Sequence, residues 1–282
     1  MLEKPAFLID STLATETEDM KIDDLFIIPL YAVVNDVPYK DFLEMGIEEF
    51  YKEMLSGSST KTSQPAVGDF VSMYEQLRDS GYSEIFVFML STGLSGTYNT
   101  AIMASEMVEG IDIYVVDTKL SSAIGGVVTK DVMEFSKTAK TATEVIEYAE
   151  KSFANTKVAA YMASLDALER GGRVSKVTAR IGNFFKIKPI ITFIEDGTFD
   201  LLAKERAESK AIRRCIDSVM NTGKPVKKVV ILHTLEEDLR AKMIAMFTEL
   251  HPNTPYLVYG LSPVLGVHLG NEGTGIFVQY EI

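Results

Sequence analysis

The sequence contains a single cysteine and no long apolar run. Cys215 alone excludes an internal disulfide, and it shares a helical face with Ile212, Ile216 and Val219, which favours core packing over a nucleophilic role. A chain without disulfides suits a reducing cytoplasm. No run of about 18 apolar residues occurs, and the first residues lack the apolar core of a signal peptide. We therefore expect a cytoplasmic protein without an integral membrane segment.

Basic residues are scarce relative to acidic ones. Lys and Arg together number 28 against 40 Asp and Glu, which gives a net charge of −12 and a pI near 4.8. An acidic chain is a poor non-specific binder of nucleic acid or of anionic membranes. Any bound anion must therefore be held by local donors. The 282 residues, 46% of them hydrophobic, suffice for one large domain or two ordinary ones.

The most informative segment runs from Glu84 to Gly110. Ile85–Leu90 is a continuous apolar run, typical of a strand buried on both faces, and Ser91–Thr97 is a small, polar turn. Helical spacing follows, with Ser95 at the predicted N-cap. Because a helix N-terminus presents free backbone N–H groups, this turn is predicted to hold an anionic group of a ligand.

Two known catalytic or nucleotide-binding turns fit this segment poorly. A Walker A loop requires a Lys after its last Gly, and none follows Gly96. A nucleophile elbow requires G-x-S-x-G, whereas Gly96 stands one position too early after Ser95. Ser95 is therefore disfavoured as a nucleophile. A serine hydrolase using Ser95, His268 and either Asp117 or Asp10 remains the alternative hypothesis.

The order of predicted elements indicates an α/β fold with two domains. Up to about residue 153, strands alternate with helices, which predicts a doubly wound, mostly parallel sheet with Asp10, the Ser91–Ser95 turn and Asp117 on one rim. The later pattern is α+β. We predict an N-terminal domain at 1–160 and a C-terminal domain at 161–282. The strands expected after Phe153 are Val158–Ala163, the hairpin Pro189–Ala203, Val226–His233, Pro255–Leu261 and Gly275–Ile282.

Three local features complete the prediction. Leu25–Val34 is expected to form one strand, and Gly57–Phe70 a polar loop rich in hydroxyl groups. His268 is expected in a glycine-flanked loop, where it can donate to an anion. A basic run indicates a patch for phosphate or an acidic partner. It contains Arg170, Arg173, Lys176, Arg180, Lys186 and Lys188.

Several short motifs occur in a fixed order along the chain, and together they resemble the DegV family of fatty-acid-binding proteins. The resemblance spans nearly the whole sequence. The motifs are Asp10-Ser11-Thr12; Pro29-Leu30 with Asp41; Thr62-Ser63-Gln64-Pro65; Ser91–Thr97; Asp117 with Ser121 and Gly125; Gly171-Gly172-Arg173 with Ser175; and Pro263, Gly266, His268 and Gly270.

The resemblance implies a carrier with no chemistry of its own. Members of this family bind one long-chain fatty acid, such as palmitate, between the two domains. A dihydroxyacetone-kinase-like fatty acid kinase then phosphorylates the carboxylate, and the acyl phosphate enters phospholipid synthesis. By this resemblance the chain has no catalytic residue, cofactor or metal, and the fatty acid is its only ligand.

The resemblance also implies residue roles. Thr62, Ser95 and His268 are expected to bind the carboxylate, and Arg173 and Arg206 to face the kinase or the transferred phosphate. The supporting residues of the site are expected to be Ser63, Gly93, Gly96 and Ser122. A carrier for a different amphipathic acid would use the same residues. The sequence departs from the family pattern at Gly270–Gly275, where Glu272 adds negative charge and a Pro is missing.

Overall fold

The computed structural model describes residues 2–15, 21–163, 172–173 and 187–282. Its first sheet is parallel, in the order β2-β1-β6-β7. Its strands are β1 (Pro5–Asp10), β2 (Leu25–Ile28), β6 (Glu84–Met89) and β7 (Asp112–Asp117). The helices around it are α2 (Val67–Asp79), α3 (Thr97–Ser105), α4 (Ile124–Ser136) and α5 (Ala142–Ala154).

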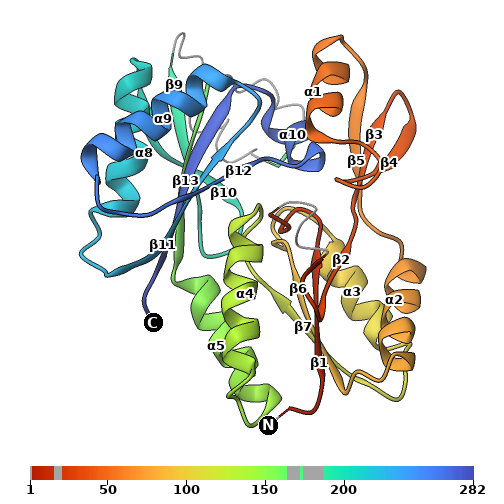
Figure 1. Cartoon of the computed structure of the whole chain (residues 1–282). Coiled ribbons are helices and arrows are strands. Elements are labelled where there is room, and N and C mark those ends of the chain that lie inside the picture. Colours follow the sequence, from red (N-terminus) through yellow and green to blue (C-terminus); the bar gives the residue numbers. More distant parts are fainter. Residues whose placement is uncertain (1, 16–20, 164–171, 174–186) are drawn as a thin grey trace.

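Both faces of this sheet are covered, which explains the continuous apolar runs of its strands. Ala6 and Leu8 of β1 pack with α2 and α3, whereas Phe7 and Ile9 point to the opposite face, with Val132 of α4 among the residues buried there. β6 alternates in the same way. Figure 1 shows α4 and α5 between this sheet and the second one. The expected doubly wound arrangement is therefore confirmed.

The second sheet is mixed, in the order β10-β9-β8-β13-β11-β12. The strands are β8 (Thr156–Met162), β9 (Lys188–Phe193), β10 (Phe199–Glu205), β11 (Val226–His233), β12 (Leu257–Gly260) and β13 (Gly273–Tyr280). Helices α8 (Glu208–Met220) and α9 (Glu237–Leu250) cover one face, where Cys215 is buried in the core as predicted. On the other face of this sheet, Val158 and Phe277 belong to the same hydrophobic core as Phe153 of α5. The sheets change between β7 and β8, so the predicted boundary at residue 160 lies within β8.

A third, antiparallel sheet was not predicted. It consists of β3 (Tyr31–Val34), β4 (Val37–Lys40) and β5 (Thr60–Ser63), in the order β4-β3-β5, and it packs near α1 (Ile47–Leu55) and α10 (Pro263–Leu269). Figure 1 shows this small sheet and α1 beside α10, although α10 lies far away in the sequence.

The small sheet corrects three sequence predictions. The prediction of a single strand over Leu25–Val34 is wrong. Pro29 lacks the N–H that a sheet ladder needs, and at this residue the chain passes from the first sheet to the small sheet. The prediction of a polar loop over Gly57–Phe70 is wrong at β5, because the backbone of β5 pairs with that of β3. The prediction of a glycine-flanked loop around His268 is wrong as well, because α10 includes this residue and ends at Leu269, just before Gly270, which has a φ of 75°.

Part of the predicted basic run lies outside the described residues. Arg170, Lys176, Arg180 and Lys186 belong to that part, as do Gly171 and Ser175 of the glycine-arginine motif. Within the described ranges, no helix combines the length and apolar character needed to cross a lipid bilayer.

The two large sheets meet at a contact that requires glycine on both sides. Ser91 Oγ donates to the Gly197 carbonyl at 2.8 Å, across the turn that joins β9 to β10. Gly197 has a φ of 73°, and a Cβ there would clash with Ser91 Oγ. A Cβ at Gly93 would lie 2.9 Å from the Asp196 carbonyl oxygen. This close approach places the Ser91–Gly96 turn directly against the second sheet.

The contact predicts an unequal cost for two glycine substitutions. Gly223 has a similar φ of 75° but open space around its Cβ position. Gly223→Ala should lower the free energy of unfolding by about 1–2 kcal/mol, from the left-handed backbone alone. Gly197→Ala should lower it by about 1–3 kcal/mol more, because of overpacking. Urea denaturation of both variants tests this, and equal losses would contradict the close contact.

Candidate functional site

The carboxyl ends of β1, β6 and β7 form the rim that the sequence predicted. Asp10 is the last residue of β1 and accepts hydrogen bonds from Leu90 N at 2.6 Å and from Thr12 Oγ1 at 2.6 Å. Asp117 is the last residue of β7 and accepts a hydrogen bond from Thr92 Oγ1 at 2.6 Å. Burial raises the pKa of Asp10 to about 6, although these hydrogen bonds oppose the shift. Both carboxylates therefore hold the turn after β6 in place.

That turn places Ser95 beside a cavity. Leu94 N and Ser95 N both donate to the Ser91 carbonyl, so the chain already curls before α3 begins at Thr97. The predicted N-cap at Ser95 is wrong by one residue, since Gly96 occupies that position without a side-chain cap. Ser95 Oγ instead lies 2.8 Å from Thr97 Oγ1. Its hydroxyl remains at the edge of the cavity.

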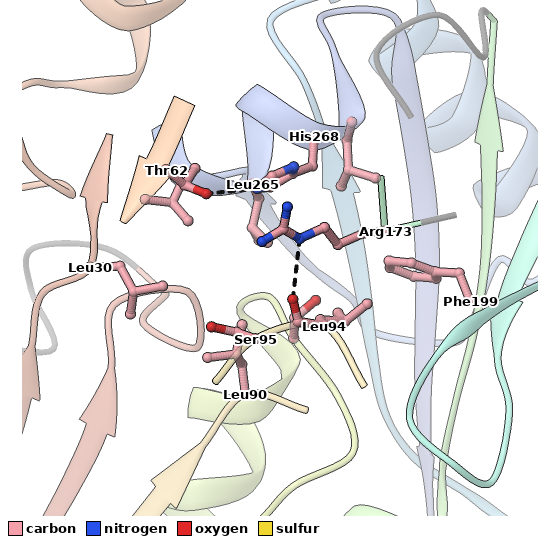
Figure 2. Close-up of a pocket in the computed structure, with 12 residues that line it drawn as sticks. Leu30, Thr62, Leu90, Leu94, Ser95, Arg173, Phe199, Leu265 and His268 are labelled. Carbon is pink, nitrogen blue, oxygen red and sulfur yellow. Dashed lines mark hydrogen bonds between the residues drawn. The ribbon is translucent and has the colours of Figure 1, made fainter. Parts of the chain in front are cut away.

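The cavity brings four of the predicted site residues together. Thr62, Ser95, Arg173 and His268 all line it. Thr62 Oγ1 and His268 Nε2 are 2.9 Å apart, and the Arg173 Nε–H donates to the Leu94 carbonyl at 3.3 Å (Figure 2). The remaining wall is mainly apolar and includes Leu30, Leu90, Leu94, Phe199, Leu265 and Leu269.

A second, almost wholly apolar cavity adjoins the first. Ser121, Phe199 and Leu269 line both cavities. Its other walls come from the second sheet and from the turn before α4. They include Ser122, Val158, Ala160, Met162, Ile191, Phe193, Leu232 and Phe277. Thr62, Ser95, Arg173 and His268 form a polar corner at one end of the two cavities. The remaining space between the sheets is lined mainly by apolar side chains.

The other predicted site residues take different positions. Gly93 and Gly96 let neighbouring segments approach the turn, since a Cβ at Gly96 would lie 2.7 Å from Gln64 Oε1. Ser63 is exposed and donates to the Gln64 carbonyl at 3.3 Å. Arg206 is exposed just after β10.

Glu272, the departure from the family pattern, is exposed as well. Its backbone carbonyl accepts a hydrogen bond from Ala163 N at 2.8 Å. Neither of the two cavities is lined by this residue. The altered loop therefore serves to extend the pairing of β13 with β8.

Sequence reasoning missed the role of Asp41 in supporting this corner. Asp41 Oδ2 accepts from Ser11 Oγ at 2.8 Å, and Oδ1 accepts from Val264 N at 3.1 Å. Ser11 Oγ in turn accepts from Leu30 N at 3.0 Å. The fully buried carboxyl group thus joins the first sheet, the small sheet and α10, which carries His268. In the sequence, the only signal for Asp41 was its place in the motif with Pro29 and Leu30.

Two hydrogen bonds distinguish this arrangement from the alternative hydrolase site. His268 Nε2 is bonded to Thr62 and Ser95 Oγ to Thr97, so neither bond joins Ser95 to His268. Asp10 and Asp117 hold the turn through Leu90 and Thr92. A triad needs a nucleophile bonded to its base and a base oriented by its acid. These contacts are not the pattern of an activated serine.

The buried Asp41 predicts a pH dependence of stability. Burial raises the pKa of Asp41 to about 7 against its hydrogen bonds, whereas an unfolded Asp titrates near 3.9. The folded state therefore keeps an extra proton between about pH 4 and pH 7, and its stability falls as pH rises through this range. Asp41→Asn should lack this contribution, while Asp10 titrates in both proteins.

The measurement is the free energy of unfolding from urea titrations at pH values across that range. The wild-type value minus the Asp41→Asn value should decrease with rising pH. Parallel pH profiles of the two proteins would contradict a raised pKa at Asp41.

Comparison with known proteins identifies the family. Residues 4–281 match the family model described as "Uncharacterised protein, DegV family". A DegV domain-containing protein of Staphylococcus aureus (strain N315) is 31% identical over 279 residues, which cover 98% of this chain and 99% of that protein.

Solved structures agree with this match. DegV from Bacillus subtilis, described as a fatty acid binding protein, is 29% identical with a TM-score of 0.88, and the match covers 100% of both chains. A Thermotoga maritima protein whose structure is described as revealing a fatty acid binding function is 29% identical with a TM-score of 0.85, again over 100% of both chains. From its family model, its relatives and its fold, this chain belongs to the DegV family.

Proposed function

We propose that this protein binds one long-chain fatty acid, with the carboxylate in the polar corner and the acyl chain in the adjoining apolar cavity. The observation that carries this proposal is the geometry of the two joined cavities. Hydroxyl, imidazole and guanidinium groups gather at one end, and the rest of the lining is apolar. The fatty acid binding described for the Bacillus subtilis and Thermotoga maritima relatives supports the same ligand class.

The chemistry of the corner suits a carboxylate. Thr62 and Ser95 offer hydroxyl groups, His268 an imidazole nitrogen and Arg173 a guanidinium group. Hydrogen bonds between an anion and such donors are charge-assisted and therefore stronger than neutral ones. Burial of the acyl chain contributes about 0.8 kcal/mol per methylene group. The carboxylate thus fixes the orientation of the ligand, and the chain supplies much of its affinity.

The corner also opens toward a polar groove. Thr62, Arg173 and His268 line this groove too, together with Ser58, Ser59, Thr60 and Lys61. A bound carboxylate would therefore be reachable from outside while its chain stays buried. This accessibility supports a carrier that presents the carboxylate to a fatty acid kinase, for acyl-phosphate formation and phospholipid synthesis, and that performs no chemistry itself.

Thr62→Val should weaken fatty acid binding. The substitution keeps the shape of the side chain but removes the hydroxyl that faces His268. A hydrogen bond to a charged group contributes about 1.5–3 kcal/mol, so the Kd for stearic acid should rise about tenfold or more. Thr60→Val is the matched control, because Thr60 lies on the same strand and lines only the outer groove among these cavities. Displacement of a fluorescent fatty acid measures both. Equal Kd values for Thr62→Val and wild type would contradict this carboxylate site.

Arg206→Ala should separate binding from presentation. Arg206 is exposed and lines neither of the two joined cavities, so the Kd for fatty acid should stay unchanged. If Arg206 meets a kinase or the transferred phosphate, the variant should lower acyl-phosphate formation about tenfold with a dihydroxyacetone-kinase-like fatty acid kinase, from the loss of a charged contact. Arg214→Ala, an exposed arginine on α8, is the control. Equal rates for wild type and Arg206→Ala would contradict this role.

A further inference from the structure

Ser122 carries an unsatisfied hydroxyl group and lies in the wall of the apolar cavity. Its side chain is only 2% exposed, and its Oγ forms no hydrogen bond with any residue that the structure describes. The residue nevertheless lines the second cavity, among side chains that are mainly aliphatic or aromatic. Thr274 lines the same cavity, but its hydroxyl donates to the Leu232 carbonyl at 2.9 Å. Leaving a buried hydroxyl without a hydrogen bond costs about 1–3 kcal/mol. We therefore expect a bound ligand to supply the hydrogen-bond partner of Ser122.

The backbone holds Ser122 in an unusual conformation. Its φ is 80°, in the left-handed region that non-glycine residues rarely occupy. The surrounding turn is fixed, because Ser91 N donates to the Leu120 carbonyl at 2.8 Å and Gly125 N donates to the Ser122 carbonyl at 2.9 Å. Such strain persists only where neighbouring contacts enforce it, and it concentrates at ligand sites. The fold thus fixes this hydroxyl at the cavity wall at a cost in energy.

We propose that the acyl cavity recognises a long-chain fatty acid that carries a hydroxyl group along its chain, bound by Ser122 Oγ. This inference rests on the proposed fatty acid binding and names the ligand more closely. A ligand hydroxyl can both donate to and accept from the serine. A saturated chain leaves Ser122 unpaired, and a cis double bond offers only its π electrons, which are weak acceptors.

The position of Ser122 places the ligand hydroxyl away from the carboxylate. Thr62, Ser95, Arg173 and His268 line the first cavity, whereas Ser122 lines only the second of the two. The cavities share Ser121, Phe199 and Leu269, so a chain that enters from the polar corner reaches Ser122 after passing these residues. The recognised hydroxyl therefore belongs to the middle or distal part of the chain. A site with a buried polar group discriminates strongly against an analogue that cannot pair with it.

The test compares stearic acid with a series of hydroxystearic acids in which the hydroxyl group moves stepwise along the chain. Displacement of a fluorescent fatty acid gives the Kd values for the full chain and for three variants. Ser122→Ala and Ser122→Gly both remove the hydroxyl, and the glycine variant also tolerates the positive φ if alanine disturbs folding. Ser152→Ala is the matched control, since Ser152 is also buried with an unpaired Oγ among the described residues but lines neither of the two joined cavities.

For wild type and Ser152→Ala, at least one hydroxy isomer should bind about tenfold tighter than stearic acid. This preference should disappear in both Ser122 variants. If stearic acid binds wild type at least as tightly as every isomer, or if the preference survives in the Ser122 variants, the inference is overturned and the proposed carrier function stands. If no acid binds to wild type, the carrier function is overturned with it.

Discussion

Ser91 and Gly197 hold the two large sheets at the separation on which both cavities depend. The Ser91 hydroxyl donates to the Gly197 carbonyl, and the absence of side chains at Gly93 and Gly197 lets the turn after β6 touch the turn between β9 and β10. Phe199, just beyond that turn, then reaches the wall of both cavities and stacks on Phe193 with ring centroids 4.4 Å apart. Without this contact the polar turn would not border an apolar space.

The carboxylate corner depends on a second, separate arrangement. Thr62 and His268 lie 206 residues apart in the sequence and meet only because the small sheet packs beside α10. Asp41 stabilises this arrangement, since it accepts hydrogen bonds from Ser11, which follows β1, and from the backbone of α10. The binding corner therefore couples three parts of the fold, and a displacement of any one of them would separate its donors.

Much of the fold could be predicted from local pattern. The apolar run of Ile85–Leu90 identified a strand covered on both faces, and the alternation of strands and helices identified the doubly wound sheet. The ordered motifs indicated the family, which the comparisons confirm. The cavity also gathers Thr62, Ser95 and His268, for which the resemblance had implied carboxylate binding, and Arg173, which was expected to face the kinase or the transferred phosphate.

The remaining features depend on tertiary contacts that local pattern does not encode. β5 is a polar segment whose strand conformation comes from pairing with β3, and α10 is a short helix that contains Gly266, where a Cβ would lie 2.8 Å from the Tyr51 hydroxyl. The roles of Asp41 and Ser122 arise from burial and from backbone conformation. Neither property is visible when residue types are read in order.

Mass spectrometry of the gently purified protein tests the carrier function most directly, first under native conditions and then after extraction with organic solvent. The account predicts one fatty acid per protein chain, and the extracted material identifies its length, unsaturation and oxygenation. A protein that carries no fatty acid, and that takes up none from a panel of long-chain and hydroxylated acids, would contradict the central claim.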